Sequence, residues 1–406
     1  MTRKRILVAD VSSDAGSSVL RQLSESGYDL IGADWRRLPF GLRSRYLRIE
    51  HLLPKPTDIG FGRSLFDLVS SVRPDVFLPL GIYTVATACR LKQSLRSVTA
   101  INIPDYDAYL AAFDKTFCNR ECRELGIPSP ASYSPEEAAG ILAGSRERAV
   151  LVVKPGTDAG MALGVTYVQD AEALRRSVSL CMIRFGSVTI QEYIPGDASH
   201  MRTAVLLFDR HSELIAAFTM QKLRQWPSTG GVTALSTSTD EFHLVEQALP
   251  FFRKWRWQGV AEVEFKFDAR DRSYKVIEIN PRFPGYQRFA MTCGLPLARL
   301  AARLALEDEN IAPLKYPSYS VGMKFVNPGL FLRTTLADMR PTSVRASALR
   351  RAIADLVGTG PAVAGMLKDS LPMIGRLQLD ILHLCGRSSS PSLYAPVRET
   401  VKSILP

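Results

Sequence analysis

Apolar and polar residues alternate along residues 260–268, a period of two that is typical of a half-buried β-strand. One face of this stretch is apolar and carries Ala261, Val263, Phe265 and Phe267. The other face is polar and carries Glu262, Glu264, Lys266 and Asp268. The alternation returns in Tyr274–Asn280, where Ile277 and Ile279 fall on one side and Glu278 and Asn280 on the other. The polar connection 269–273 joins the two, so the pattern predicts a β-hairpin.

The register of this hairpin brings two acidic residues together. If the chain turns about Asp271, Glu264 lies opposite Glu278, with Cβ atoms roughly 4.5–5.5 Å apart. Two like charges at that distance repel, so a stable fold needs a reason to keep them, and a divalent cation supplies one. Asn280 points to the same side as Glu278, and oxygen ligands of this kind suit Mg²⁺. The alternation also predicts that Arg282 reaches this pocket, where its guanidinium can hold a phosphate or a carboxylate.

A single alternating strand would favour an ordinary hairpin with a charged face in solvent. Opposed glutamates with an asparagine and an arginine in step favour a metal site instead. The predicted ligands are Glu264, Glu278 and Asn280.

The first third of the chain alternates strands and helices. We expect strands at 5–9, 28–33 and 76–80 and helices at 16–26 and 64–72, which is a βαβ pattern. The loop after the first strand lacks the G-x-G-x-x-G sequence, so dinucleotide binding is not indicated. Residues 1–107 therefore read as a Rossmann-like domain without its usual cofactor loop.

A glycine-rich loop lies between two predicted strands in the middle of the chain. We expect a helix over 108–125 that contains Lys115, then a strand at 150–153 that leads into Lys154. The loop 156–164 follows, with three glycines, and then a strand at 165–168. Glycine lets backbone N–H groups approach phosphate oxygens, so the loop can be a phosphate-covering flap. A plain hairpin turn is the alternative.

The remaining pattern predicts further strands and helices. Strands are expected at 188–193, 203–208, 214–220 and 318–325, and helices at 241–255 and 295–306. A polar loop is expected at 221–233, and residues 334–406 read as helical in patches. This last segment can be a helical appendage that packs on the core, a dimer face, or an element that contacts a membrane surface.

Composition adds limits to this picture. With 406 residues, 46% of them hydrophobic, the chain can form two or three domains. The net charge of +11 is consistent with an anionic partner or with basic residues distributed over the whole surface. The sequence has no run of basic residues interleaved with aromatic ones, so nucleic-acid binding is not indicated. Six scattered cysteines form no C-x-x-C, and no stretch of 18 apolar residues occurs. We therefore expect a cytoplasmic protein with reduced thiols.

With Lys115, Lys154, the glycine loop, the QEYI strand and the VEF…IEINPR hairpin in this order, residues 1–310 resemble the ATP-grasp superfamily. The similarity is to its carboxylate–amine ligases and to the large subunit of carbamoyl phosphate synthetase. It implies an α/β fold of the ATP-grasp type: a Rossmann-like domain at 1–107, an ATP-grasp domain at 108–310 and a mostly helical extension at 311–406. The ATP-grasp domain would divide into a lid at about 108–185 and a metal and substrate subdomain at 186–310.

The resemblance also implies roles for individual residues. Its nucleotide-binding positions match Lys115, Lys154, Gly160, Gly164, Gln191, Glu192, Tyr193, Ile194 and Asp197. Its Mg²⁺ ligands, which can also hold Mn²⁺, match Glu264, Glu278 and Asn280. Arg282 matches the arginine that steadies the transferred phosphoryl group, and Lys222 and Arg224 lie where relatives approach the γ-phosphate or the acid substrate. One departure is the flap sequence AGMALGV, which lacks the usual glycine–serine pair.

The implied reaction joins a carboxylate to an amine through an acyl phosphate, at the expense of ATP. The substrates would be small and amino-acid-like. Two alternatives are phosphorylation of a small acid, as in carbamoyl phosphate synthesis, and a non-catalytic ATP-binding regulator. The extension at 311–406 leaves a homodimer and a peripheral membrane contact open.

Overall fold

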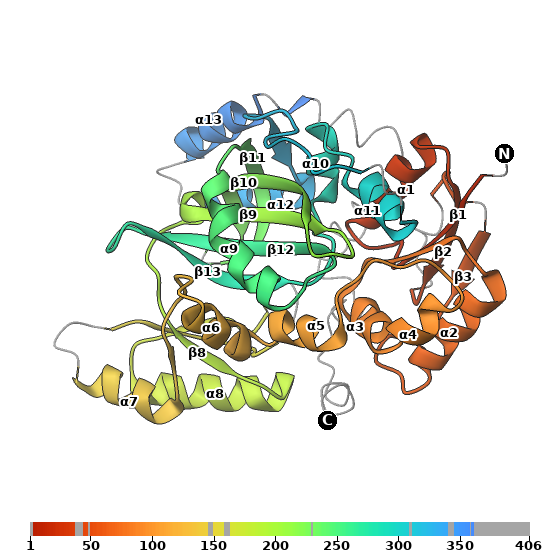
Figure 1. The fold of residues 1–406 in the computed structure, drawn as a ribbon. Coiled ribbons are helices and arrows are strands. Elements are labelled where there is room, and N and C mark those ends of the chain that lie inside the picture. Colours follow the sequence, from red (N-terminus) through yellow and green to blue (C-terminus); the bar gives the residue numbers. More distant parts are fainter. Residues whose placement is uncertain are drawn as a thin grey trace.

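The computed structural model describes residues 3–36, 44–47, 49–144, 149–157, 163–228, 230–307, 311–339, 345–357 and 359–360. Three sheets organise these residues (Figure 1). Among them, no helix is both long enough and apolar enough to cross a bilayer.

The first sheet is parallel, as the βαβ pattern predicts. Its strands are β1 (Arg5–Ala9), β2 (Asp29–Asp34), β3 (Ile49–Leu52) and β4 (Val76–Pro79), in the order β3-β2-β1-β4. The helices of this region are α1 (Gly16–Glu25), α2 (Phe61–Val72), α3 (Ile82–Arg90) and α4 (Lys92–Arg96). Leu7 and Ile31 pack in a core with side chains of α2 and α3, whereas Ile6 and Val8 belong to a core that includes α1. The sheet is thus covered on both faces, as parallel sheets normally are.

The second sheet lies in the lower part of Figure 1, and we call it the lid after the predicted lid segment that contains most of it. It contains β5 (Ser132–Tyr133), β6 (Leu151–Lys154), β7 (Thr166–Val168) and β8 (Thr189–Glu192), in the order β5-β8-β6-β7. Strand β8 lies beyond residue 185 in sequence and still pairs with β6 and β5. The helices α7 (Pro135–Gly144) and α8 (Ala171–Phe185) cover the lid and share its small apolar core.

The third sheet is antiparallel and has six strands in the order β13-β12-β9-β10-β11-β14. They are β9 (Met201–Phe208), β10 (Leu214–Trp226), β11 (Val232–Thr239), β12 (Gly259–Asp268), β13 (Ser273–Asn280) and β14 (Lys324–Val326). The short 3₁₀ helix η1 (Ala198–His200) precedes β9. On one face, Ala261, Val263 and Phe265 form a core with α9 (Phe242–Lys254). On the other, Val260 joins the core that also contains Ile6 and Val8 of the first sheet.

Four more helices follow the β12–β13 hairpin. Helices α10 (Gln287–Thr292) and α11 (Leu297–Ala305) lie between the first and third sheets and contribute to their shared core. Helices α12 (Pro328–Asp338) and α13 (Arg345–Leu356) follow β14, and α12 contacts β10 and β11. The predicted strand at 318–325 is reduced to the three residues of β14.

Two predictions about elements are wrong. The expected helix over 108–125 is two helices, α5 (Tyr106–Phe113) and α6 (Lys115–Glu124), because Asp114 is extended and caps the second. The expected polar loop at 221–233 is largely strand, since β10 continues to Trp226 and β11 starts at Val232. These two strands pair and bury polar side chains such as Lys222. The polarity of the stretch is the reason why the sequence pattern indicated a loop.

Candidate ATP and metal site

The predicted hairpin register is confirmed at its centre. Glu264 of β12 lies opposite Glu278 of β13, and the preceding pair on the same face is Glu262 opposite Asn280. A bulge then shifts the register by one residue, so that Phe265 pairs with Val276. The expectation that Ile277 and Ile279 share a face is therefore wrong: Val276 and Ile279 enter the apolar core instead.

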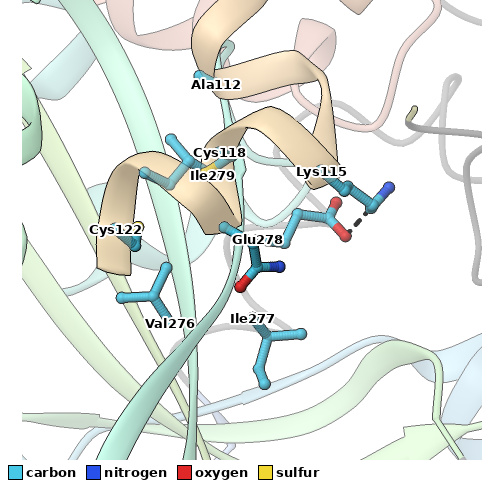
Figure 2. Close-up of a pocket in the computed structure, with 9 residues that line it drawn as sticks. Ala112, Lys115, Cys118, Cys122, Val276, Ile277, Glu278 and Ile279 are labelled. Atoms are coloured by element: carbon cyan, nitrogen blue, oxygen red, sulfur yellow. Dashed lines mark ion pairs between the residues drawn. The ribbon is translucent and has the colours of Figure 1, made fainter. Parts of the chain in front are cut away.

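Each of the opposed glutamates carries a lysine as counter-ion. Lys115 Nζ lies 3.3 Å from Glu278 Oε2, and Lys222 Nζ lies 2.9 Å from Glu264 Oε2. Both lysines are buried, whereas the two glutamates are partly exposed. Figure 2 shows Lys115 at the end of α6, with its ammonium group turned toward Glu278 of β13. Two pairs side by side thus cancel the repulsion that the sequence predicts between the carboxylates.

The position of Lys115 follows from the break between α5 and α6. The Asp114 carboxylate accepts hydrogen bonds from the backbone N–H groups of Thr116 and Phe117, which is an N-cap of α6. Lys115 is consequently the first residue of a helix, and its own N–H donates to the carbonyl of Gly156 at 2.7 Å. That bond connects α6 to the start of the predicted flap.

Lys154 lies at the end of β6 and is buried beside Lys115. Its Nζ donates to the carbonyl of Ile277 at 3.4 Å, at the bulge of β13. Burial, and next the charge of Lys115, lower the pKa of Lys154 to about 8. Two ammonium groups held close together by the fold favour an anion between them, and a polyphosphate has the required charge.

Glu262 is a site residue that the sequence reasoning placed on the polar face but assigned no role. Its carboxylate accepts a 2.6 Å hydrogen bond from the Tyr286 hydroxyl and lies 3.8 Å from Arg282 Nη1. Burial, followed by the charge of Glu264, raises the pKa of Glu262 to about 7. The signal was available, because the pairing rule that sets Glu264 opposite Glu278 also sets Glu262 opposite Asn280.

The segment after Asn280 brings polar groups to the same face. Arg282 Nη1 donates to the Phe283 carbonyl at 3.2 Å, and its guanidinium is partly exposed. Gln287, at the start of α10, is buried, and neither its Oε1 nor its Nε2 makes a hydrogen bond within the described part of the chain. An unsatisfied buried amide is costly, so a polar ligand is one way to satisfy it.

The predicted hinge residues lie on and after β8. Gln191 donates to the Ser132 hydroxyl, and the backbone N–H of Glu192 donates to the Ala131 carbonyl. The Glu192 carboxylate accepts from Ala131 N–H and from Arg270, which follows β12 and so ties the lid to the hairpin. Ile194 is buried at the end of the segment.

Two further positions expected near the nucleotide have local partners. The Tyr193 ring stands edge-on to Tyr167. Asp197 caps η1 and accepts from Ser199 and His200, and these hydrogen bonds hold the pKa of its carboxyl below the ordinary value. A contact between Asp197 and a ribose stays a prediction.

The flap is described only at its two ends. Gly164 has a φ of +78°, and a Cβ there would lie 2.4 Å from a ring carbon of Phe185, so both conformation and space require glycine. Gly160 lies outside the described residues.

Arg224 has carboxylate partners outside the glutamate pairs. Its Nε donates to Asp355 at 2.7 Å and its Nη1 to Asp338 at 3.1 Å, so the guanidinium is held by α12 and α13. A bulge in the pairing of β10 with β11 separates Arg224 from Lys222. The role of Arg224 at the γ-phosphate stays a prediction.

The oxygen donors suit a small divalent cation. Mg²⁺ commonly takes one or two protein carboxylates and completes its shell with water and phosphate oxygens. Glu264 and Glu278 are two such carboxylates, and Asn280 adds an amide on the same face of β13. Within the described chain, no three Asp, Glu, His or Cys side chains form a group that could hold a metal ion by themselves. Two carboxylates and an amide leave coordination positions for phosphate oxygens, so these three residues fit a cation that is bound together with phosphate.

Comparison with known proteins matches the middle of the chain to a known family. Residues 114–310 match the family described as the carbamoyl-phosphate synthase L chain, ATP binding domain. Over 225 residues the chain is 23% identical to a D-aspartate ligase of Enterococcus faecium, covering 51% of this chain and 53% of that protein. The chain thus spans about half the length of this curated relative.

Solved structures share the fold at low sequence identity. The biotin carboxylase domain of Hydrogenobacter thermophilus 2-oxoglutarate carboxylase has a TM-score of 0.63 at 14% identity, covering 80% of this chain and 74% of that one. An L-amino acid ligase from Bacillus licheniformis has a TM-score of 0.55 at 14% identity, covering 77% and 78%. Residues 114–310 thus match an ATP-grasp family, and the solved structures show that the chain has the α/β fold of the ATP-grasp type.

Proposed function

We propose that the protein is an ATP- and Mg²⁺-dependent ligase that joins a carboxylate to an amine through an acyl phosphate. The observation that carries the proposal is the pair of opposed glutamates, Glu264 and Glu278, each matched by a buried lysine. This arrangement presents carboxylates to a cation and ammonium groups to phosphates within one face of the sheet.

ATP would bind between the lid and the six-stranded sheet. Lys115 and Lys154 would hold phosphate oxygens, and the flap that ends at Gly164 would cover them. Residues 191–194 would contact adenine and Asp197 the ribose. Support comes from the two adjacent lysines and from the family match, which covers all of these positions.

Glu264, Glu278 and Asn280 would hold Mg²⁺, or Mn²⁺ in its place. When bound, the cation neutralises charge on the phosphates. Lys115 and Lys222 are the counter-ions of the two glutamates, so they must exchange part of these contacts for phosphate when the nucleotide arrives.

The chemistry would proceed in two displacements. A substrate carboxylate oxygen attacks the γ-phosphorus of ATP in line, the bond to the β–γ bridging oxygen breaks, and ADP leaves. The amine then attacks the acyl carbon, loses a proton, and displaces phosphate to give an amide. Arg282 and Lys222 would stabilise the transferred group by charge, and lid closure would exclude water from the acyl phosphate.

The comparisons favour an amino-acid substrate. The curated relative is named a D-aspartate ligase, and a structural neighbour is an L-amino acid ligase. The buried Gln287 amide follows Tyr286, which binds Glu262, and it is a further polar group that a carboxylate or amine substrate could satisfy. We therefore propose small, amino-acid-like substrates on both sides of the new bond.

The test measures ADP release with Mg-ATP and pools of D- and L-amino acids. We expect release that needs an acid–amine pair, with mass spectrometry showing an amide. Glu278→Gln should lower kcat by at least about a hundredfold, since it removes charge at the centre of phosphoryl transfer. Glu172→Gln, on the exposed face of α8, is the matched control and should leave the rate unchanged.

Other outcomes would contradict the proposal in distinct ways. The neighbour from Hydrogenobacter thermophilus was solved with MgADP and bicarbonate, so release of ADP with bicarbonate alone would support phosphorylation of a small acid. Tight binding of Mg-ATP without turnover on any pool would support a nucleotide sensor. An unchanged rate in Glu278→Gln would remove the site from the chemistry altogether.

A further inference from the structure

Helix α13 packs with its small residues and exposes its large apolar ones. Ala348 and Ala352 are buried, with 1% and 4% of their surface exposed. Leu349 and Ile353 are 49% and 60% exposed, and Val357, just beyond the helix, is 68% exposed. A surface helix normally turns its large apolar residues to the core, so this orientation is reversed. The outer face of α13 therefore remains available to another apolar surface.

Helix α12 contributes to the same kind of surface. It buries Leu330 and Phe331, and it exposes Leu332 and Leu336, which are one helical turn apart. Helices α12 and α13 contact each other. In Figure 1, α13 lies at the upper edge, whereas the lid helices α7 and α8 lie at the lower edge. We call the exposed side chains of these two helices the α12–α13 face.

The charges at the α12–α13 face are almost entirely positive. Residues 311–360 contain two acidic residues, Asp338 and Asp355, and both are bound to Arg224 of β10. Arg350 and Arg351 are exposed on α13, next to Leu349. Arg224 offsets one of these two negative charges, and the exposed residues of the two helices are otherwise apolar side chains and arginines.

The net charge of the whole chain is concentrated in the same part of the sequence. Residues 311–406 contain twelve Lys and Arg and five Asp and Glu, which is +7 of the total of +11. The first 310 residues carry the remaining +4 on more than three times the length. The basic character is therefore a property of the C-terminal segment, which indicates an anionic partner for that segment.

The combination of groups distinguishes between partners. A second copy of the chain would bring the same positive charge, and two such faces repel each other. Nucleic acid would contact the arginines through its phosphates, but it would make no contact that uses the exposed leucines and isoleucine. An anionic lipid surface uses both, because apolar side chains enter the acyl boundary while arginines contact the headgroups.

We propose that the α12–α13 face docks the protein on anionic lipid membranes as a peripheral contact. The contact is independent of the ligase reaction, because none of its exposed residues belongs to the glutamate and lysine pairs. In Figure 1, α13 lies at the opposite edge of the molecule from α7 and α8, so docking through α13 would hold the lid helices away from the membrane.

Co-sedimentation of the full chain with vesicles tests this proposal. The vesicles are phosphatidylcholine alone or phosphatidylcholine with phosphatidylglycerol. We expect pelleting only with the anionic vesicles, and weaker pelleting at high salt. Leu349→Gln with Ile353→Gln should lower the partition coefficient at least about tenfold, because the apolar groups that enter the lipid are removed. Arg350→Gln with Arg351→Gln should lower it by about fivefold per arginine.

A matched control uses exposed apolar residues on the lid. Leu180 and Met182 of α8 are 66% and 46% exposed, so Leu180→Gln with Met182→Gln changes a comparable surface elsewhere. This variant should pellet like the wild type, and all variants should keep the wild-type melting temperature because the changed residues are exposed. Equal pelleting of the Leu349/Ile353 variant and the wild type, or no pelleting at all, would overturn the proposal. Light scattering that shows a dimer, lost in the Leu349/Ile353 variant without any vesicle binding, would assign the face to a second copy.

Discussion

Lys154 illustrates how a single residue can be arranged for a ligand at the expense of stability. Its side chain is buried, and its ammonium group lies close to that of Lys115. Both the loss of hydration and the repulsion between the two positive charges therefore destabilise the charged form of Lys154. An anion would relieve both effects at once. A strained charge in a buried position is more often found at functional sites than elsewhere.

The lowered pKa of Lys154, about 8, predicts a pH effect on nucleotide use. Below pH 8 the ammonium form attracts phosphate, and above it the neutral amine does not. We expect kcat/KM for ATP to be constant below pH 8 and to fall above it, with a limiting slope of about tenfold per pH unit. In Lys154→Arg the guanidinium stays charged, so the fall near pH 8 should vanish even where the absolute rate is lower. An identical fall in both proteins would show that another group titrates.

The same shift has a defined sign in stability. The pKa of Lys154 is lower in the folded chain than its ordinary value of 10.5, so folding opposes the charged form. This unfavourable contribution to the free energy of unfolding is fully present below about pH 8, and it disappears as the pH rises toward 10.5. Lys154→Met should therefore gain stability over the wild type at pH 7, and the gain should shrink by pH 10.

At the scale of elements, the hairpin could be predicted closely and its neighbours could not. Alternation, together with a turn centred on Asp271, sets Glu264 opposite Glu278, because the side-chain period of a strand is two and one face is buried. The bulge at Ile277 is invisible to that rule, since it depends on packing between Val276 and the core. The strand at 221–226 could not be predicted from polarity. Lys222 is a charged residue, and it can be buried because it forms an ion pair with Glu264.

The break between α5 and α6 is an element whose geometry serves the site. Asp114→Ala removes the side chain that accepts from Thr116 and Phe117, and such a loss costs about 1 kcal/mol. Because Lys115 is the first residue of α6, fraying there should also displace its ammonium group from Glu278. We expect the KM for ATP to rise about threefold to thirtyfold, along with the loss of stability measured by urea unfolding.

A second capped helix provides the matched comparison. Asp170 caps α8 by accepting from the Ala173 N–H, and no predicted phosphate-binding residue follows it. Asp170→Ala should cost about as much stability, near 1 kcal/mol, and leave the KM for ATP unchanged. Equal changes in KM for the two variants would mean that α6 has no special part in holding Lys115.

At the scale of the whole molecule, the part after residue 310 is not separate from the ATP-grasp core. Strand β14 pairs with β11, and α12 packs on β10 and β11, so this segment completes the six-stranded sheet. The sequence could not show this, because β14 has only three residues and its neighbours in space lie about ninety positions earlier. A short edge strand is set by pairing and not by its own pattern.

The continuity of the sheet predicts where the chain can be shortened. A chain that ends at Pro317 loses β14 and α12 and exposes Leu235, while Val326, Leu330 and Phe331 no longer cover the sheet. A large apolar side chain contributes about 1.5–3 kcal/mol when buried, so the loss of several should exceed about 4 kcal/mol. For a domain of roughly 150–250 residues this lowers Tm by about 8 °C or more. A chain that ends at Gly360 keeps each of these contacts, so its Tm should stay above that of the chain that ends at Pro317. If the two shortened chains have the same Tm, β14 and α12 do not stabilise the sheet, and the segment after residue 310 is a separate appendage.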